Sequence, residues 1–194
     1  MKRVLYLLPL SILLWACPYE SKVPLADKPS QAIDSTLLGY WYGIIKDGSD
    51  FFGIEALDIS KHSDSVYSIV RYGKGVKGDI ILPDTAYFTG FTSYIGDQCY
   101  MNVEGSIVVE VPRRNKPPEY RTEKIYYLSA MTRNNDTLRV ETITENFSPS
   151  RRTIKTPADL VKLINETQAI QKNIYDEQYT LSYKKIPKPP ALNR

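Results

Sequence analysis

The chain has 194 residues, with 25 Lys and Arg against 22 Asp and Glu, and 42% of its residues are hydrophobic. This balance fits one folded domain with tails and excludes a disordered or collagen-like chain. Two cysteines exclude a disulfide-rich scaffold, and a single histidine argues against a histidine-based metal site.

Residues 1–16 have the composition of a signal peptide. Lys2 and Arg3 precede an apolar run over residues 4–15. Twelve residues of helix rise about 18 Å, which is too short for the roughly 30 Å hydrocarbon core of a bilayer. The run therefore predicts a signal peptide that takes no part in the fold.

The signal peptide ends in Leu14-Trp15-Ala16-Cys17, which resembles the lipobox of bacterial lipoproteins: an aliphatic, a variable and a small residue before the cysteine that is lipidated. The resemblance implies a diacylglycerol on the sulfur of Cys17 and an acyl chain such as palmitate on its amine. Several acyl chains give stable membrane anchoring. The expected location is the outer membrane, facing the periplasm, with surface exposure as the alternative.

Processing also changes the charge. Removing residues 1–16 takes away Lys2 and Arg3, so the formal net charge of +3 falls by two. Such a balance is not that of a nucleic-acid-binding protein. The membrane, reached through the lipid anchor, is thus an expected partner and nucleic acid is not.

Residues 17–35 contain three prolines and no apolar periodicity, so we expect the lipid anchor and a flexible tether there. A single β-domain is expected over residues 36–186. Alternating or β-rich runs predict strands at 37–46, 51–60, 65–72, 79–82, 85–92, 99–111, 120–132, 137–145 and 178–186. Pro83-Asp84 and residues 112–118 are interpreted as breaks between strands. The strands are not separated by long crossover helices, which predicts an antiparallel meander.

One helix is expected before the last strand, over about 157–175. Thr156 is a good N-cap, and Asp159 three residues later completes a capping-box pattern. Leu160, Leu163 and Ile164 recur at helical spacing and predict an apolar stripe that covers an open end or a face of the sheet. The Pro-rich tail over 187–194 is expected to be loose.

About eight strands in a meander avoid exposed edges by closing into a barrel, and a two-sheet β-sandwich is the alternative. Gly39-Tyr40-Trp41 resembles the G-x-W signature of lipocalins, and Gly43 extends it to the G-x-W-x-G of related small barrels. The late helix matches their element order. The resemblance implies that Trp41 fills the closed end of a lipocalin-like barrel; a core aromatic on a first strand is the other interpretation. Arg139 is one candidate for the arginine that lipocalins pack on this tryptophan.

The sequence contains no nucleophile elbow, zinc-protease motif, phosphate loop or Cys/His metal spacing. We therefore expect no enzymatic activity, no catalytic or metal-binding residue and no cofactor, and we interpret His62 as a solvated turn residue. The first functional hypothesis is binding of a small apolar or amphipathic ligand inside the barrel. The alternative is a structural or interaction lipoprotein that docks an envelope protein or glycan. An apolar cavity would favour the first, and a packed interior with an exposed tyrosine-rich face the second.

Tyrosines suited to such a face, or to half-buried strands, are Tyr40, Tyr42, Tyr87, Tyr94, Tyr100, Tyr126 and Tyr127. Basic residues cluster at 113–116, 151–155 and 184–188, either as solvated segments or as patches for anionic headgroups. Asp followed by Ser or Thr, and then by an aliphatic residue, Met or Thr, resembles an O-glycosylation sequon of some Gram-negative bacteria. Its four matches place candidate acceptors at Ser35, Ser65, Thr85 and Thr137, all interpreted as turn positions before a strand.

Overall fold

A computed structural model describes residues 18–47, 51–77, 80–113, 116–144, 147, 154–170 and 174–190. Their elements, in chain order, are β1 (Glu20–Ser21), β2 (Gly39–Asp47), β3 (Phe51–Lys61), β4 (Tyr67–Lys77), β5 (Ile80–Ile95), β6 (Gln98–Arg113), β7 (Lys116–Asn134), β8 (Thr137–Ile143), α1 (Pro157–Ile170) and β9 (Tyr175–Ile186).

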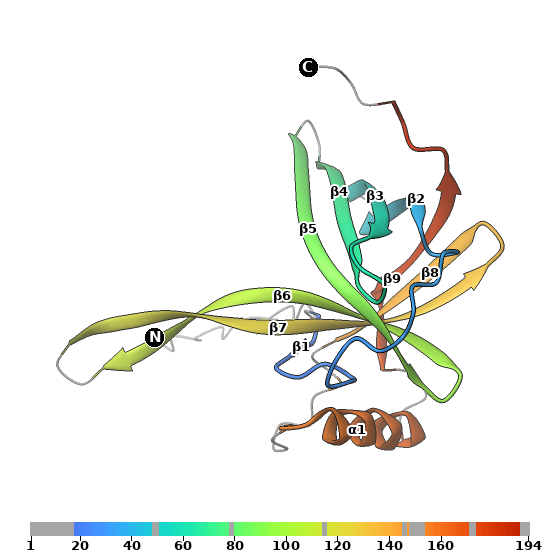
Figure 1. Cartoon of the computed structure of the whole chain (residues 1–194). Coiled ribbons are helices and arrows are strands. Elements are labelled where there is room, and N and C mark those ends of the chain that lie inside the picture. The colour runs from blue at the N-terminus through green and yellow to red at the C-terminus, as the bar shows by residue number, and fades with distance from the viewer. Residues whose placement is uncertain are drawn as a thin grey trace, which may run out of the picture.

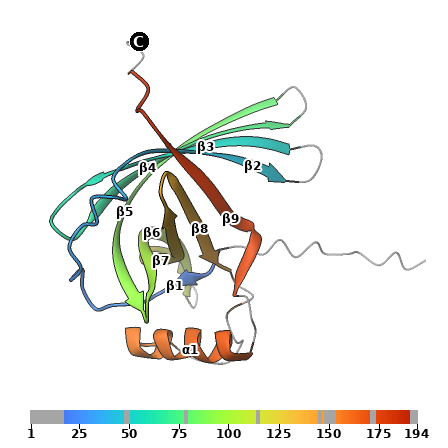
Figure 2. The ribbon, with the colours of Figure 1, turned by 90° about the vertical axis from the view of Figure 1, so that its right-hand side faces the viewer.

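Strands β2 to β9 form a closed antiparallel barrel (Figures 1 and 2). Each strand pairs with the next from β2 to β8, and β9 closes the ring by pairing with both β8 and β2. Strand β1 lies outside the ring, on the edge of β7. The predicted eight-stranded, lipocalin-like meander with a helix before its last strand is therefore confirmed, and the sandwich alternative is wrong.

The two ends of the barrel differ. At one end, here called the closed end, the interior is filled by large side chains, and Trp41, Tyr67 and Leu138 are each fully buried. Residues 62–66, between β3 and β4, and the turn at Asn135, between β7 and β8, also lie at this end. The β2–β3, β4–β5 and β6–β7 hairpins all point to the opposite, open end.

At the open end the barrel divides. Strands β5 and β6 pair only from Thr89–Glu104 to Ile95–Gln98, so the outer halves of both strands lack that pairing. Beyond this point β6 and β7 pair with each other as far as Arg113 and Lys116. They project from the barrel as a two-stranded arm, residues 105–113 and 116–125 (Figure 1).

Two of the predicted strand breaks are wrong, for one physical reason. Strand β5 runs unbroken through Pro83, which pairs with Lys74 on β4. Likewise β6 continues through Pro112 to Arg113, and β7 begins at Lys116, before Pro117 and Pro118. Proline lacks a donor but is tolerated in strands with a free edge, and the divided open end supplies such edges.

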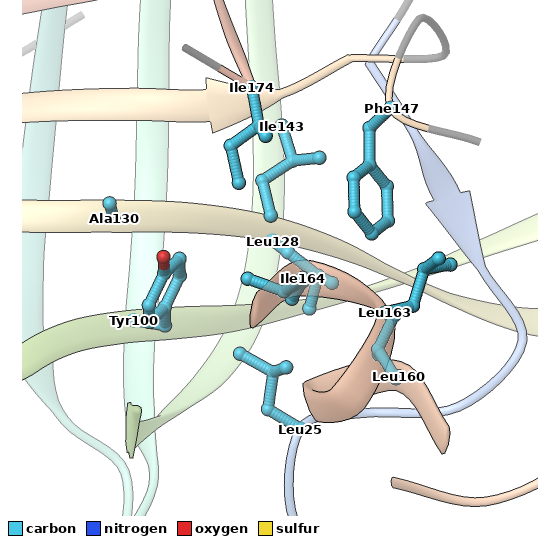
Figure 3. Packing of buried hydrophobic residues seen from close by; sticks show 10 residues of the cluster. All are labelled: Leu25, Tyr100, Leu128, Ala130, Ile143, Phe147, Leu160, Leu163, Ile164 and Ile174. Atoms are coloured by element: carbon cyan, nitrogen blue, oxygen red, sulfur yellow. The ribbon is translucent and has the colours of Figure 1, made fainter. Parts of the chain in front are cut away.

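Helix α1 covers the outer face of the barrel across β6, β7 and β8 (Figure 3). Its buried residues are the predicted Leu160, Leu163 and Ile164, and they pack with Tyr100 and Leu128. The capping box is confirmed, because Asp159 N donates to Thr156 Oγ1 at 3.2 Å and Thr156 N donates to an Asp159 carboxylate oxygen at 3.0 Å. The helix ends at Ile170, earlier than predicted, and Tyr175 already belongs to β9.

The segment expected to be a flexible tether packs on the barrel at residues 19–25. Tyr19 stacks edge-to-face on Phe147 at 5.2 Å between ring centroids, and Leu25 is buried in the same cluster as α1. The amide of Leu25 donates to Asn102 Oδ1 at 2.7 Å. Asn102 is fully buried, so this polar contact stabilises the segment on β6.

Candidate functional site: a tyrosine surface on the outside of the barrel

Period-two alternation separates two faces of the sheet formed by β2, β3 and β4. Trp41 and Gly43 point into the barrel, so Tyr40 and Tyr42 point outward. The register continues this outer face onto β3 at Ala56 and β4 at Tyr72. Tyr72 is 39% exposed, and Tyr87 on β5 is 77% exposed.

Of these residues, Tyr40, Tyr42, Ala56 and Tyr72 line an open groove of about 300 Å³, here called the tyrosine surface. Its lining residues are Tyr40, Tyr42, Ile54, Ala56, Tyr72, Gly73, Lys74, Ile186 and Pro189. The rings of Tyr40 and Tyr72 lie 6.3 Å apart between centroids, tilted by 37°. Burial, followed by the neighbouring Tyr72 and Asp58, raises the pKa of Tyr40, so its hydroxyl stays protonated and can donate a hydrogen bond.

The described part of the C-terminal tail forms one wall of this groove. Lys188 Nζ makes an ion pair with Asp58, whose side chain is 16% exposed, and Pro189 lines the groove. Residues 187–190 are exposed and belong to no helix or strand, and the looseness of the tail stays a prediction. The sequence offered Tyr40 and Tyr42 as surface candidates but not Tyr72 or Pro189, because their proximity depends on strand register.

Between the closed end and the open end, the inner wall of the barrel carries a cluster of polar side chains instead of an apolar lining. The hydroxyl of Tyr183 donates to Glu55 Oε1 at 2.6 Å, and Arg71 Nη1 lies 3.6 Å from Glu55 Oε2. Arg71 also pairs with Asp84. Glu55 is 6% exposed, and burial raises the pKa of Tyr183 well above its usual range. Gly43 is required here, because a Cβ at that position would lie 2.8 Å from the Tyr183 ring.

Trp41 is fully buried at the closed end, which fits both interpretations of this residue. Its Nε1 donates to Leu37 O at 2.9 Å. The cation on its ring is Lys185, with Nζ 5.1 Å from the ring centroid. The candidate Arg139 is wrong for this role, since it pairs with Glu141 on the outer face of β8. Gly39 has a φ of 132° and leaves room for the Lys185 stem, which a Cβ would meet at 2.8 Å.

The four candidate glycosylation acceptors lie in different settings. Ser35 is exposed in a turn, and Ser65 is half-buried at the last position of the bend at 62–65. Thr85 is exposed but lies within β5, opposite Tyr72, so its turn assignment is wrong. Thr137 is half-buried at the first position of β8. Modification of these residues stays a prediction.

Of the other candidate residues, Cys17 lies outside the described part of the chain. His62 is exposed in the turn between β3 and β4. Cys99 is half-buried next to Tyr94, and burial raises the pKa of its thiol, as expected for a packing cysteine. Tyr100 is buried under α1, whereas Tyr126 and Tyr127 are half-buried beside β1.

Within the described residues, groups of three or more His, Cys, Asp or Glu side chains arranged to hold a metal ion are absent. The same part of the chain contains no helix that is long and apolar enough to cross a membrane. Comparison of the sequence with protein-family models, with curated proteins and with solved structures returned no match.

Proposed function

We propose that this protein is a lipoprotein, anchored through Cys17, whose barrel binds an envelope glycan on the tyrosine surface without catalysing a reaction. The observation that carries the proposal is the groove of about 300 Å³ lined by Tyr40, Tyr42 and Tyr72. Tyrosine combines a flat apolar ring with a hydroxyl, which suits a sugar ring with its C–H face and its hydroxyl rim.

The barrel interior supports this choice over an apolar ligand inside the barrel. At the closed end, Trp41, Met101 and Met131 are at most 7% exposed, so large side chains fill the space. Nearer the open end, the inner wall of the barrel is polar, because Glu55, Arg71 and Asp84 lie there. A buried carboxylate is a costly neighbour for an apolar ligand.

The anchor is tested by replacing Cys17 with Ser in the full chain, expressed in its native host. The variant should lose the mass of the acyl chains and leave the membrane fraction. Cys99→Ser is the matched control and should keep both. A Cys17→Ser variant that still carries acyl chains would refute the anchor.

The binding surface is tested with the mature lipoprotein in detergent micelles on an array of bacterial glycans. We expect binding, and a loss of at least tenfold in affinity for the double variant Tyr40→Ala, Tyr72→Ala. Tyr120 is 66% exposed on the arm, so Tyr120→Ala is a control with the same chemical change. Absence of glycan binding by the unaltered protein would overturn the glycan proposal.

A second candidate is an amphipathic small molecule at the open end, with its polar part at Glu55 and Arg71. The observation that favours it is the Tyr183–Glu55–Arg71–Asp84 group on the inner wall. Native mass spectrometry of the mature protein separates the two candidates. A stoichiometric co-purifying small molecule, lost in Arg71→Met and retained in Tyr72→Ala, would support the inner site.

A further inference from the structure

We infer that the tyrosine surface selects acidic oligosaccharides, with sugar rings on the tyrosines and carboxylates at Lys74 and Lys184. This inference rests on the proposed glycan-binding function and adds the ligand's charge. It comes from the lysines around the groove, which the aromatic residues alone do not explain.

The outer face has an excess of positive charge. Lys74 lines the groove on β4, and Lys184 on β9 pairs in register with Tyr42. Both lysines are exposed, and neither has an ion-pair partner among the described residues. Exposed lysines beside a partly apolar groove attract anionic groups at moderate ionic strength.

The carboxylate of Asp58, on the same face, does not cancel this charge. Lys188 pairs with it, and that hydrogen bond is the main cause that raises the pKa of Lys188. The ammonium of Lys188 therefore stays charged at physiological pH and offsets the carboxylate of Asp58. Lys74 and Lys184 are left as the uncompensated charges.

The spacing fits an oligosaccharide better than a single sugar. Lys184, Tyr42, Ala56 and Tyr72 stand side by side on β9, β2, β3 and β4. Three strand spacings amount to about 14 Å. Lys74 follows Tyr72 by two residues on the same face of β4. The two lysines thus flank the aromatic residues, so a bound chain would meet a positive charge near each end.

The test uses carboxyl-bearing oligosaccharides (tetragalacturonate, a mannuronate tetramer and sialyllactose), each beside its carboxyl-reduced derivative. Reduction replaces the carboxylate with a neutral CH₂OH group and leaves the ring in place. For the mature protein in micelles, at least one acidic ligand should bind tenfold or more tightly than its reduced form. That preference should weaken as the salt concentration rises.

The double variant Lys74→Glu, Lys184→Glu should lose at least tenfold in affinity for the acidic ligand and change less than twofold for the reduced one. Lys116→Glu, an exposed lysine on the arm, is the control and should change neither affinity. Equal binding of acidic and reduced forms would overturn this inference and leave the proposed function standing. No binding of any glycan would overturn both.

Discussion

The closed end of the barrel and the arm are built from the same antiparallel strands, yet their side chains are buried very differently. Trp41 at the closed end is fully buried, whereas Val108 and Tyr120 on the arm are 67% and 66% exposed. The two regions differ in the number of neighbouring strands. The closed end is surrounded by the whole ring of strands, whereas the arm consists of β6 and β7 alone. A two-stranded ribbon is marginally stable by itself. Stability should therefore reside in the closed end and under α1, and the outer surfaces are left free for binding.

The largest expected effect comes from Trp41→Ala, which empties the closed end. Loss of a fully buried aromatic should lower the free energy of unfolding by about 3–5 kcal/mol. Urea unfolding followed by circular dichroism measures it, with Tyr120→Ala as the control, expected to change by less than about 0.5 kcal/mol. Equal losses of unfolding free energy in the two variants would contradict the claim that stability resides in the closed end and not in the arm.

Asn102→Ala should come next, because it removes the side chain that stabilises the N-terminal segment on β6. The amide of Leu25 would be buried without its acceptor, and Asn102 also donates to Phe91 O and to Ser93 Oγ. We expect a loss of about 2–3 kcal/mol in the free energy of unfolding. Faster hydrogen exchange at residues 19–25 would show that the segment is released, and unchanged exchange there would contradict its role.

Tyr183→Phe should cost about 1–3 kcal/mol at pH 8, since the buried Glu55 loses a donor. The substitution should also change how the free energy of unfolding depends on pH in the alkaline range. Burial, followed by Glu55, raises the folded-state pKa of Tyr183 above the unfolded value near 10. Its contribution is complete below pH 10 and is lost as the pH rises above it. Between pH 8 and 11, the free energy of unfolding should therefore fall less steeply with pH in Tyr183→Phe than in the unaltered chain. Equal slopes in the two proteins would contradict this prediction.

The smallest expected effect is that of shortening the arm. Replacing residues 106–124 with Asn-Gly joins Gly105 to Ile125, which already pair, through a two-residue turn. The exposed arm residues contribute little, so the free energy of unfolding should change by about 1 kcal/mol or less. Trp41 is the only tryptophan after residue 16, so its fluorescence reports on the closed end. A shifted Trp41 emission would show that the arm supports the barrel after all.

The sequence predicted the local elements because their causes are local. Alternation and turn residues produced eight of the strands, and Thr156 with Asp159 began the helix where expected. The strand break predicted at Pro83 was wrong, because a proline ends a strand only when both edges of the strand are paired. Which edges are paired is decided by the tertiary structure. The burial of Asn102 has no local cause, because Leu25, whose amide donates to its side chain, is 77 residues away in the chain.

What the sequence determined by itself was therefore a meander of strands, one capped helix and an inward-pointing Trp41. The tertiary structure decided which faces are covered. It placed α1 and residues 19–25 on the outer face of β6 to β8, and left the outer face of β2 to β4 open. The tyrosine surface exists only through that difference, since alternation separates two faces of a strand but cannot say which neighbour will bury either one.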